Sequence, residues 1–188
     1  MGGDGSDPRP LTVALDRSIE AAVWAADGRS LYVSYEEAGG TRVACVGLDG
    51  TVRPLVEGLS GSALDRPYSG GEFSVADDGS IAFTSGSASL PSDIALFHGG
   101  DRRQLTRLNQ TLRATRRMGE VRKLTTPSSF DQRPIDAWIT LPTNYVEGQR
   151  YPLILEIHGG PFSAYGPHFS TDNQLYAAAG YVVLSVNP

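Results

Sequence analysis

The stretch that decides the fold of this chain is Tyr151-Pro152-Leu153-Ile154-Leu155-Glu156-Ile157-His158-Gly159-Gly160-Pro161. The run from Leu153 to Ile157 is almost entirely apolar, which is typical of a strand buried on both faces in a parallel sheet. The glycines that follow predict a tight loop directly after that strand. We therefore expect a buried strand that ends in a glycine-rich loop, and the flanking sequence predicts the kind of sheet.

A helix and a second apolar strand are predicted after this loop. Thr171-x-x-Gln174 fits a capping box, with Thr171 as the N-cap residue of the helix. The helix continues from Leu175 to Ala179, and Gly180 stands where a left-handed residue ends many helices. Tyr181 to Val186 is again nearly continuous and apolar, so the order strand, helix, strand predicts a βαβ unit.

Two further strands precede this unit. They are predicted over Glu120–Leu124 and Pro134–Leu141, with a turn around Ser128–Arg133. The second alternates as a half-buried antiparallel strand does, with one apolar face made of Ile135, Ala137, Ile139 and Leu141. Two antiparallel strands followed by βαβ is the order in which an α/β-hydrolase sheet begins. Residues 118–188 are therefore predicted to form the N-terminal part of an α/β-hydrolase catalytic domain.

The first half of the chain has a different pattern, with short strands between turn residues and no helical period. The strands expected there are Ala21–Ala25, Leu31–Tyr35, Arg42–Val46, Val52–Val56, Phe73–Val75, Ile81–Ser85, Asp93–Phe97 and Arg103–Thr106. Aligning the Asp27-Gly28 and Asp78-Gly79 turns gives an offset of 51 residues, near the period of a four-stranded propeller blade. We expect an all-β partial β-propeller of about two blades over residues 1–117, with a flexible leader. A closed propeller needs roughly four to eight blades, so this half is expected to belong to something larger.

Composition excludes several classes of function. The net charge of −5 gives no overall attraction to nucleic acid or to anionic membranes. The stretch Arg102–Lys123 holds eight basic residues and one acid, and we expect it to be a seam between the two halves, without a nucleic-acid role. No membrane span, metal site or cofactor site is predicted, and Cys45 is expected to be a small buried hydrophobe.

Four segments together resemble the prolyl oligopeptidase family of serine peptidases, and within it the acylaminoacyl-peptidase and dipeptidyl-peptidase branches. They are Arg103-Gln104-Leu105-Thr106, Ala137-Trp138-Ile139-Thr140-Leu141-Pro142, Tyr151 to Pro161, and Ala178 to Pro188. In that family, a β-propeller caps an α/β-hydrolase domain and filters substrates to peptides. The resemblance implies that the intact protein cleaves peptide or acyl-peptide bonds through an acyl-enzyme.

The resemblance also implies roles in the loop after the strand. The second glycine of His-Gly-Gly-Pro donates its N–H to the oxyanion in the acylaminoacyl-peptidase branch, and this role falls on Gly160. His158 and Gly159 then form the supporting loop, with His158 bracing it through a hydrogen bond. Other branches place a tyrosine donor where His158 stands, and His158 is not the histidine of a catalytic triad.

The nucleophile of such an enzyme is not found in these residues. No Gly-x-Ser-x-Gly string occurs, and Gly58-Leu59-Ser60-Gly61-Ser62 fails at its last position. The family's serine, aspartate and histidine follow the Asn-Pro at which this sequence ends, so we expect the chain alone to be inactive. An esterase or isopeptidase-type amide hydrolase on the same scaffold stays open, as does a non-catalytic propeller that binds a partner.

Other features have plainer interpretations. His98-Gly99-Gly100 repeats the tripeptide after another apolar run, and the strand that follows predicts a hairpin turn there. Glu36-Glu37 is interpreted as a solvated turn, and Glu156 as a paired polar group of the sheet. The oligomeric state is left open. Residues 1–8 lack the features of a signal peptide, which favours a cytoplasmic location, and a periplasmic one stays open if a signal peptide precedes them.

Overall fold

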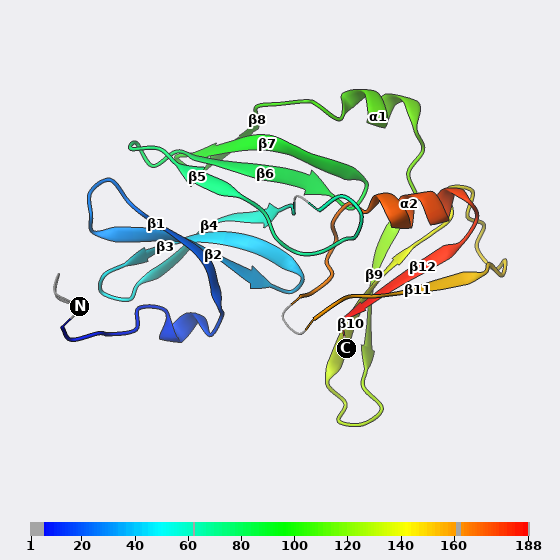
Figure 1. Cartoon of the computed structure of the whole chain (residues 1–188), viewed down its shortest axis with the longest axis horizontal. Coiled ribbons are helices and arrows are strands. Elements are labelled where there is room, and N and C mark those ends of the chain that lie inside the picture. Colours follow the sequence, from blue (N-terminus) through cyan, green and yellow to red (C-terminus); the bar gives the residue numbers. More distant parts are fainter. Residues whose placement is uncertain (1–5, 62, 161–162, 188) are drawn as a thin grey trace.

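The computed structural model describes residues 6–61, 63–160 and 163–187. Two antiparallel meanders lie next to each other in one part of the molecule, and a smaller four-stranded sheet with a helix on it lies beside them (Figure 1). Pro161, the last residue of the predicted His-Gly-Gly-Pro motif, lies outside the described residues, as do the first five residues, Ser62, Phe162 and Pro188.

The first meander consists of four strands that follow one another in the chain. They are β1 (Ile19–Trp24), β2 (Ser30–Glu37), β3 (Gly40–Gly47) and β4 (Val52–Leu59), preceded by the short 3-10 turn η1 (Val13–Leu15). Each strand pairs antiparallel with the next, and Gly28, Gly39 and Gly50 all have positive φ in the turns between them. The turn residues thus set the strand boundaries, as the sequence predicted.

The second meander repeats this build. Its strands are β5 (Phe73–Val75), β6 (Ile81–Ser87), β7 (Leu90–His98) and β8 (Asp101–Gln104). Leu59 on β4 pairs with Ser85 on β6, which joins both meanders in one eight-stranded, β-propeller-like sheet. His98 pairs with Asp101 across Gly99 (φ +60°) and Gly100 (φ +97°), so the predicted hairpin turn at this copy of the tripeptide is confirmed.

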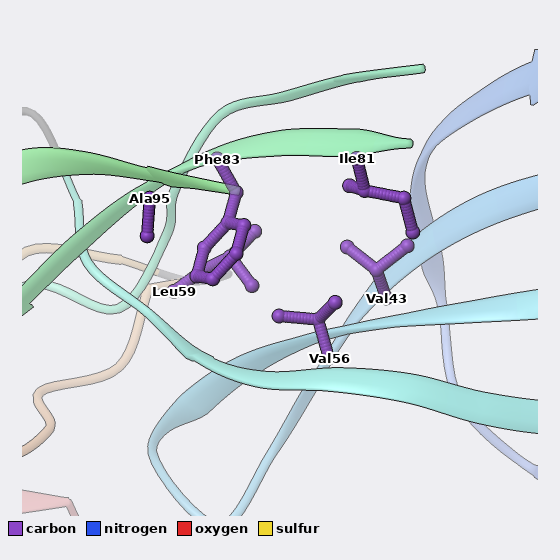
Figure 2. Close-up of a cluster of buried hydrophobic side chains, with 6 residues drawn as sticks. All are labelled: Val43, Val56, Leu59, Ile81, Phe83 and Ala95. Atoms are coloured by element: carbon purple, nitrogen blue, oxygen red, sulfur yellow. The ribbon is translucent and has the colours of Figure 1, made fainter. Parts of the chain in front are cut away.

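The main hydrophobic core lies between the two meanders. Figure 2 shows Val43, Val56 and Leu59 of the first meander facing Ile81, Phe83 and Ala95 of the second, and each is at most 6% exposed. Burial of a Val, Leu, Ile or Phe side chain contributes about 1.5–3 kcal/mol relative to exposure. The two meanders therefore stabilise each other through their faces far more than through their single shared strand pairing.

The second sheet has the predicted βαβ unit at one side. Its strands are β9 (Val121–Pro127), β10 (Pro134–Thr140), β11 (Leu153–Ile157) and β12 (Val182–Asn187), in the order β11-β12-β10-β9. β11 and β12 are parallel, β10 is antiparallel to β12 and to β9, and helix α2 (Thr171–Ala178) packs on β12 and β10. Trp138 and Val183 are buried in this sheet.

The start of helix α2 differs from the prediction by one residue. Ser170, with extended backbone, is the N-cap, and its hydroxyl accepts the N–H of Asn173 at 3.1 Å. Thr171 is the first helical residue, and the Gln174 side chain accepts the N–H of Gly119 instead of closing a capping box. The proposed Thr171 cap is therefore wrong, because the preceding serine already satisfies this end of the helix. Gly180 has φ +94°, as predicted.

Two other expectations are overturned. Helix α1 (Gln110–Thr115) lies in the basic stretch between β8 and β9, where no helical period was found, and none of its residues is buried. β11 is not buried on both faces, since Leu153, Leu155 and Ile157 are 59%, 53% and 72% exposed. β11 is the edge strand of the described sheet. Its exposed apolar side chains lie on one face of the strand, and no described residue covers that face.

Candidate active site

The predicted site residues follow directly after β11. The Nδ1 atom of His158 lies 2.6 Å from the carbonyl oxygen of Gly159, to which it donates when protonated, and its ring meets Tyr165 edge-on at 5.3 Å. The Gly159 N–H donates to the hydroxyl of Tyr68 at 3.1 Å. His158 and Tyr68 therefore hold the two peptide groups on either side of Gly159.

Gly160 differs from Gly159 in its surroundings. Among the described residues, no acceptor bonds the Gly160 N–H, and a Cβ built on Gly160 would meet nothing within 4 Å. Neither Gly159 nor Gly160 has a positive φ, in contrast to both glycines of the hairpin copy. The backbone here does not require glycine for its conformation, and the space that a Cβ would occupy at position 160 is free of described atoms within 4 Å.

Tyr68 belongs to the segment that joins the two meanders, and this segment pairs with the loop after β11. The Ser69 N–H donates to Ala164 O and the Gly166 N–H donates to Pro67 O, both at 2.9 Å, around the bridge between Tyr68 and Tyr165. The rings of these two tyrosines also contact each other, with centroids 5.1 Å apart. The position of Tyr68 is thus fixed by backbone bonds on both sides and by its ring.

An ion pair lies beneath this contact. Arg66 Nη1 lies 2.7 Å from Glu156 Oε2 and donates to the Tyr165 hydroxyl at 3.3 Å. Glu156 is 7% exposed, so the interpretation of this residue as a paired polar group of the sheet is confirmed. Burial raises the pKa of the Tyr165 phenol, and the bond from Arg66 opposes that rise, so the phenol is neutral at neutral pH.

The same segment completes the start of helix α2. The N–H groups of Thr171 and Asp172 donate to the carbonyls of Leu64 and Asp65 at 2.6 and 3.2 Å, and the Ser170 hydroxyl donates to Asp65 O at 2.6 Å. The first N–H groups of a helix have no partner within the helix and need one elsewhere. Here they find it in the segment between the two meanders.

The turn between β2 and β3 makes a second contact with the four-stranded sheet. A Cβ on Gly39, which has φ +78°, would lie 2.7 Å from the Trp138 side chain, so only glycine fits there. His168 Nε2 bonds Gly39 O at 2.9 Å. His168 is 8% exposed, and this burial lowers the pKa of its imidazole.

The glutamate pair is not the solvated turn that was predicted. Glu36 and Glu37 end strand β2 and are half-buried. Glu36 accepts the hydroxyl of Ser69 at 2.5 Å, and Glu37 forms ion pairs with Arg42 at 2.7 Å and Arg17 at 3.3 Å. The pair lies outside any helix, as expected, but both carboxylates have protein partners.

The rejected serine string is no nucleophile in the structure. Ser60 follows β4 directly and is 5% exposed, and its carbonyl accepts the hydroxyl of Thr84 at 2.7 Å. Over residues 6–61, 63–160 and 163–187, no group of three or more His, Cys, Asp or Glu side chains could hold a metal ion. In the same described ranges, no helix is long and apolar enough to cross a membrane.

Sequence reasoning identified the loop after β11 but missed its partners. Arg66 and Tyr68 lie some ninety residues before Glu156 and Gly159, in a polar stretch without hydrophobic periodicity. A single sequence holds no signal for pairing at that separation.

Comparison with known proteins gives the class to which this arrangement belongs. No family model matches. Dipeptidyl-peptidase 5 of Trichophyton schoenleinii is 28% identical over 192 residues, which cover 99% of this chain and 26% of that protein. An acylaminoacyl peptidase in complex with Z-Gly-Gly-Phe-chloromethyl ketone matches with a TM-score of 0.80, 25% identity and coverage of 97% of this chain and 27% of that one. For the Pyrococcus horikoshii acylaminoacyl peptidase the TM-score is 0.79, with 26% identity and coverage of 97% and 27%.

The matched acylaminoacyl peptidases cover both the β-propeller-like sheet of this chain and its four-stranded sheet. These matches support the resemblance to the prolyl oligopeptidase family of serine peptidases that the sequence implied. The chain spans about a quarter of the length of the curated relatives it matches.

Proposed function

We propose that this chain is part of a serine peptidase that hydrolyses peptide or acyl-peptide bonds through an acyl-enzyme. In this proposal the Gly160 N–H is one donor of the oxyanion hole. The observation that carries the proposal is the contrast between the two glycines, since the Gly159 N–H is bonded to Tyr68 while the Gly160 N–H has no acceptor among the described residues, and a Cβ on Gly160 would meet none of them within 4 Å. An oxyanion donor must be both fixed in place and free to bond the substrate.

The proposed chemistry assigns roles to both halves. A serine outside these residues attacks the scissile carbonyl, and the oxygen that gains negative charge accepts the Gly160 N–H and the N–H that follows the serine. His158 and Gly159 support the loop. Residues 118–188 begin the catalytic domain, and residues 1–117 hold two blades of the propeller, one for each four-stranded meander. The expected substrates are peptides or acyl-peptides.

The first experiment asks whether the protein is a serine hydrolase at all. The full-length natural protein that carries this sequence should label with a fluorophosphonate and cleave members of a peptide panel faster than matched esters. Residues 1–188 alone, which hold no Gly-x-Ser-x-Gly string, should do neither. Absence of labelling and turnover in the full-length protein would favour a non-catalytic binding module, and faster ester cleavage would favour an esterase.

A second experiment tests the role of Gly160 directly. Gly160→Pro removes the N–H donor and should lower kcat by about 10²–10³-fold, the usual cost of one lost oxyanion donor. Gly160→Ala keeps the N–H, and its added Cβ meets no protein atom within 4 Å, so this control should fold as well as the wild type. Equal kcat values for the two variants would contradict the assignment.

A further inference from the structure

We propose that Tyr68, from the propeller-like part of the chain, is a positioning residue for the Gly160 N–H. This inference rests on the proposed function, because it concerns how the suggested oxyanion donor is held. Tyr68 touches neither substrate nor reacting atoms in this proposal. It acts through Gly159, whose N–H donates to its hydroxyl at 3.1 Å.

Two consecutive peptide groups are held at this point in the loop. Each peptide group is planar, so fixing one of its polar atoms also fixes the direction of the other. Tyr68 bonds the N–H of the peptide between His158 and Gly159. The His158 ring bonds the carbonyl of the next peptide, between Gly159 and Gly160, and that plane carries the Gly160 N–H on its opposite side.

Both contacts are needed because of the residue between them. Gly159 has more freedom in its two torsion angles than any other residue type, so one fixed plane does not fix the next. With His158 alone, the bond is made to a neighbouring residue and moves with the loop. Tyr68 comes from a different segment of the chain, and the bonds of its neighbours Ser69 and Pro67 to Ala164 and Gly166 tie that segment to a later part of the same loop.

The hydroxyl of Tyr68 also prevents the Gly159 N–H from acting as a donor to the oxyanion. A bonded Gly159 N–H cannot compete with Gly160 for the oxyanion, so of the two glycines only Gly160 keeps an N–H without an acceptor among the described residues. Without the hydroxyl, Gly159 N–H has no other acceptor among the described residues. The loop would then sample orientations in which Gly160 points elsewhere, and the rate would fall in proportion to the lost population.

The test is Tyr68→Phe in the full-length natural protein, which keeps the ring against Tyr165 and removes only the hydroxyl. We expect kcat to fall about tenfold, the equivalent of roughly one lost net hydrogen bond, while KM stays unchanged and the melting temperature falls no more than in the control variant below. Hydrogen exchange in peptides spanning residues 157–160 should become faster.

Tyr151→Phe is the matched control. The Tyr151 hydroxyl accepts the backbone N–H of Val146 at 2.8 Å and donates to Gln149 Oε1 at 3.2 Å. The control therefore breaks the same kind of bond to a backbone N–H, with the same substitution, outside the loop. It should leave kcat and exchange at residues 157–160 as in the wild type.

Three outcomes are distinct. Kinetics and exchange of Tyr68→Phe that match Tyr151→Phe overturn the positioning role. A Tyr68→Phe effect confined to KM or to melting temperature also overturns it, because the role would then be substrate binding or stability. If the wild-type protein shows no turnover, the proposed function fails, and hydrogen exchange at residues 157–160 still decides whether Tyr68 holds the loop.

Discussion

Arg66 and Glu156 form an ion pair with 2.7 Å between Nη1 and Oε2, although one lies between the two meanders and the other in strand β11. The carboxylate side chain is 9% exposed and the guanidinium side chain 37% exposed. The pair therefore has one buried and one partly solvated member. The pair affects the free energy of unfolding mainly because removal of Arg66 would leave the buried Glu156 carboxylate without a cation.

Arg66→Ala is expected to destabilise the protein by about 2 kcal/mol, because it leaves a buried carboxylate without its cation. The partial exposure of Arg66 keeps this below the cost of breaking a fully buried pair. Urea unfolding of both variants measures it, with Arg133→Ala as the control, since the Arg133–Asp131 pair is 85% and 37% exposed and should contribute less than about 0.5 kcal/mol. An equal loss in both variants would rule out a special role for the Arg66 pair.

His168 is expected to make stability depend on pH. Its folded-state pKa lies below the ordinary value of 6.5, so the unfolded chain binds more protons than the folded protein between the two values. The stability that the neutral imidazole contributes is therefore complete above pH 6.5, declines as the pH falls below it, and is lost below the folded-state pKa. Unfolding free energies measured from pH 8 to pH 5 should show this slope in the wild type and a weaker one in His168→Gln. Parallel curves would refute it.

Gly39→Ala is expected to cost about 2–4 kcal/mol of stability. The substitution combines a positive φ, which disfavours a Cβ by about 1–2 kcal/mol, with overpacking against Trp138. Gly28→Ala separates the two effects, because Gly28 has φ +64° and nothing within 4 Å of its added Cβ. Thermal unfolding should therefore place Gly28→Ala between the wild type and Gly39→Ala. The contact with Trp138 would be unimportant if the two variants melted together.

Ser170→Ala should destabilise the protein by about 1–2 kcal/mol, since it removes the cap of helix α2 and the bond to Asp65 O. Thr171→Ala is the informative partner, because the sequence alone placed the cap there. Its side chain is exposed, and we expect a change within about 0.5 kcal/mol. Chemical denaturation of the two variants compares them directly, and a larger loss in Thr171→Ala would restore the original capping assignment.

The parts of the fold that depend on neighbouring residues could be predicted from the sequence. Turn glycines such as Gly28 and Gly79 set the strand boundaries, and the antiparallel pairing of Pro134–Thr140 was predicted correctly. The half-buried alternation predicted for this strand is wrong, since Trp138 and Thr140 on the face opposite Ala137 are buried too. Helix α1 was missed because none of its residues is buried, which leaves no apolar period to detect. The exposure of Ile157 was missed because an apolar run cannot tell which neighbours cover it.

The candidate site divides in the same way. Its loop could be predicted, since an apolar strand followed by His158-Gly159-Gly160 is a local pattern. The glycine pair of the hairpin turn at Gly99 has the same local pattern up to that point. The strand that follows it predicted the turn, and the φ angles in the structure separate the two copies. Tyr68 could not be predicted, because its bond to Gly159 depends on how the two halves fold against each other.

The bonds between residues 64–69 and residues 164–172 also limit which segments related proteins can exchange by recombination. A chimaera that takes its propeller-like part from one protein and its sheet from another would bring together two surfaces that had not changed together. The backbone carbonyls at positions 64 and 65 could then lie out of reach of the first N–H groups of helix α2. A carboxylate at position 156 would meet an unrelated side chain at position 66. Successful crossovers should therefore carry both segments from one parent, whatever the origin of the strands between them.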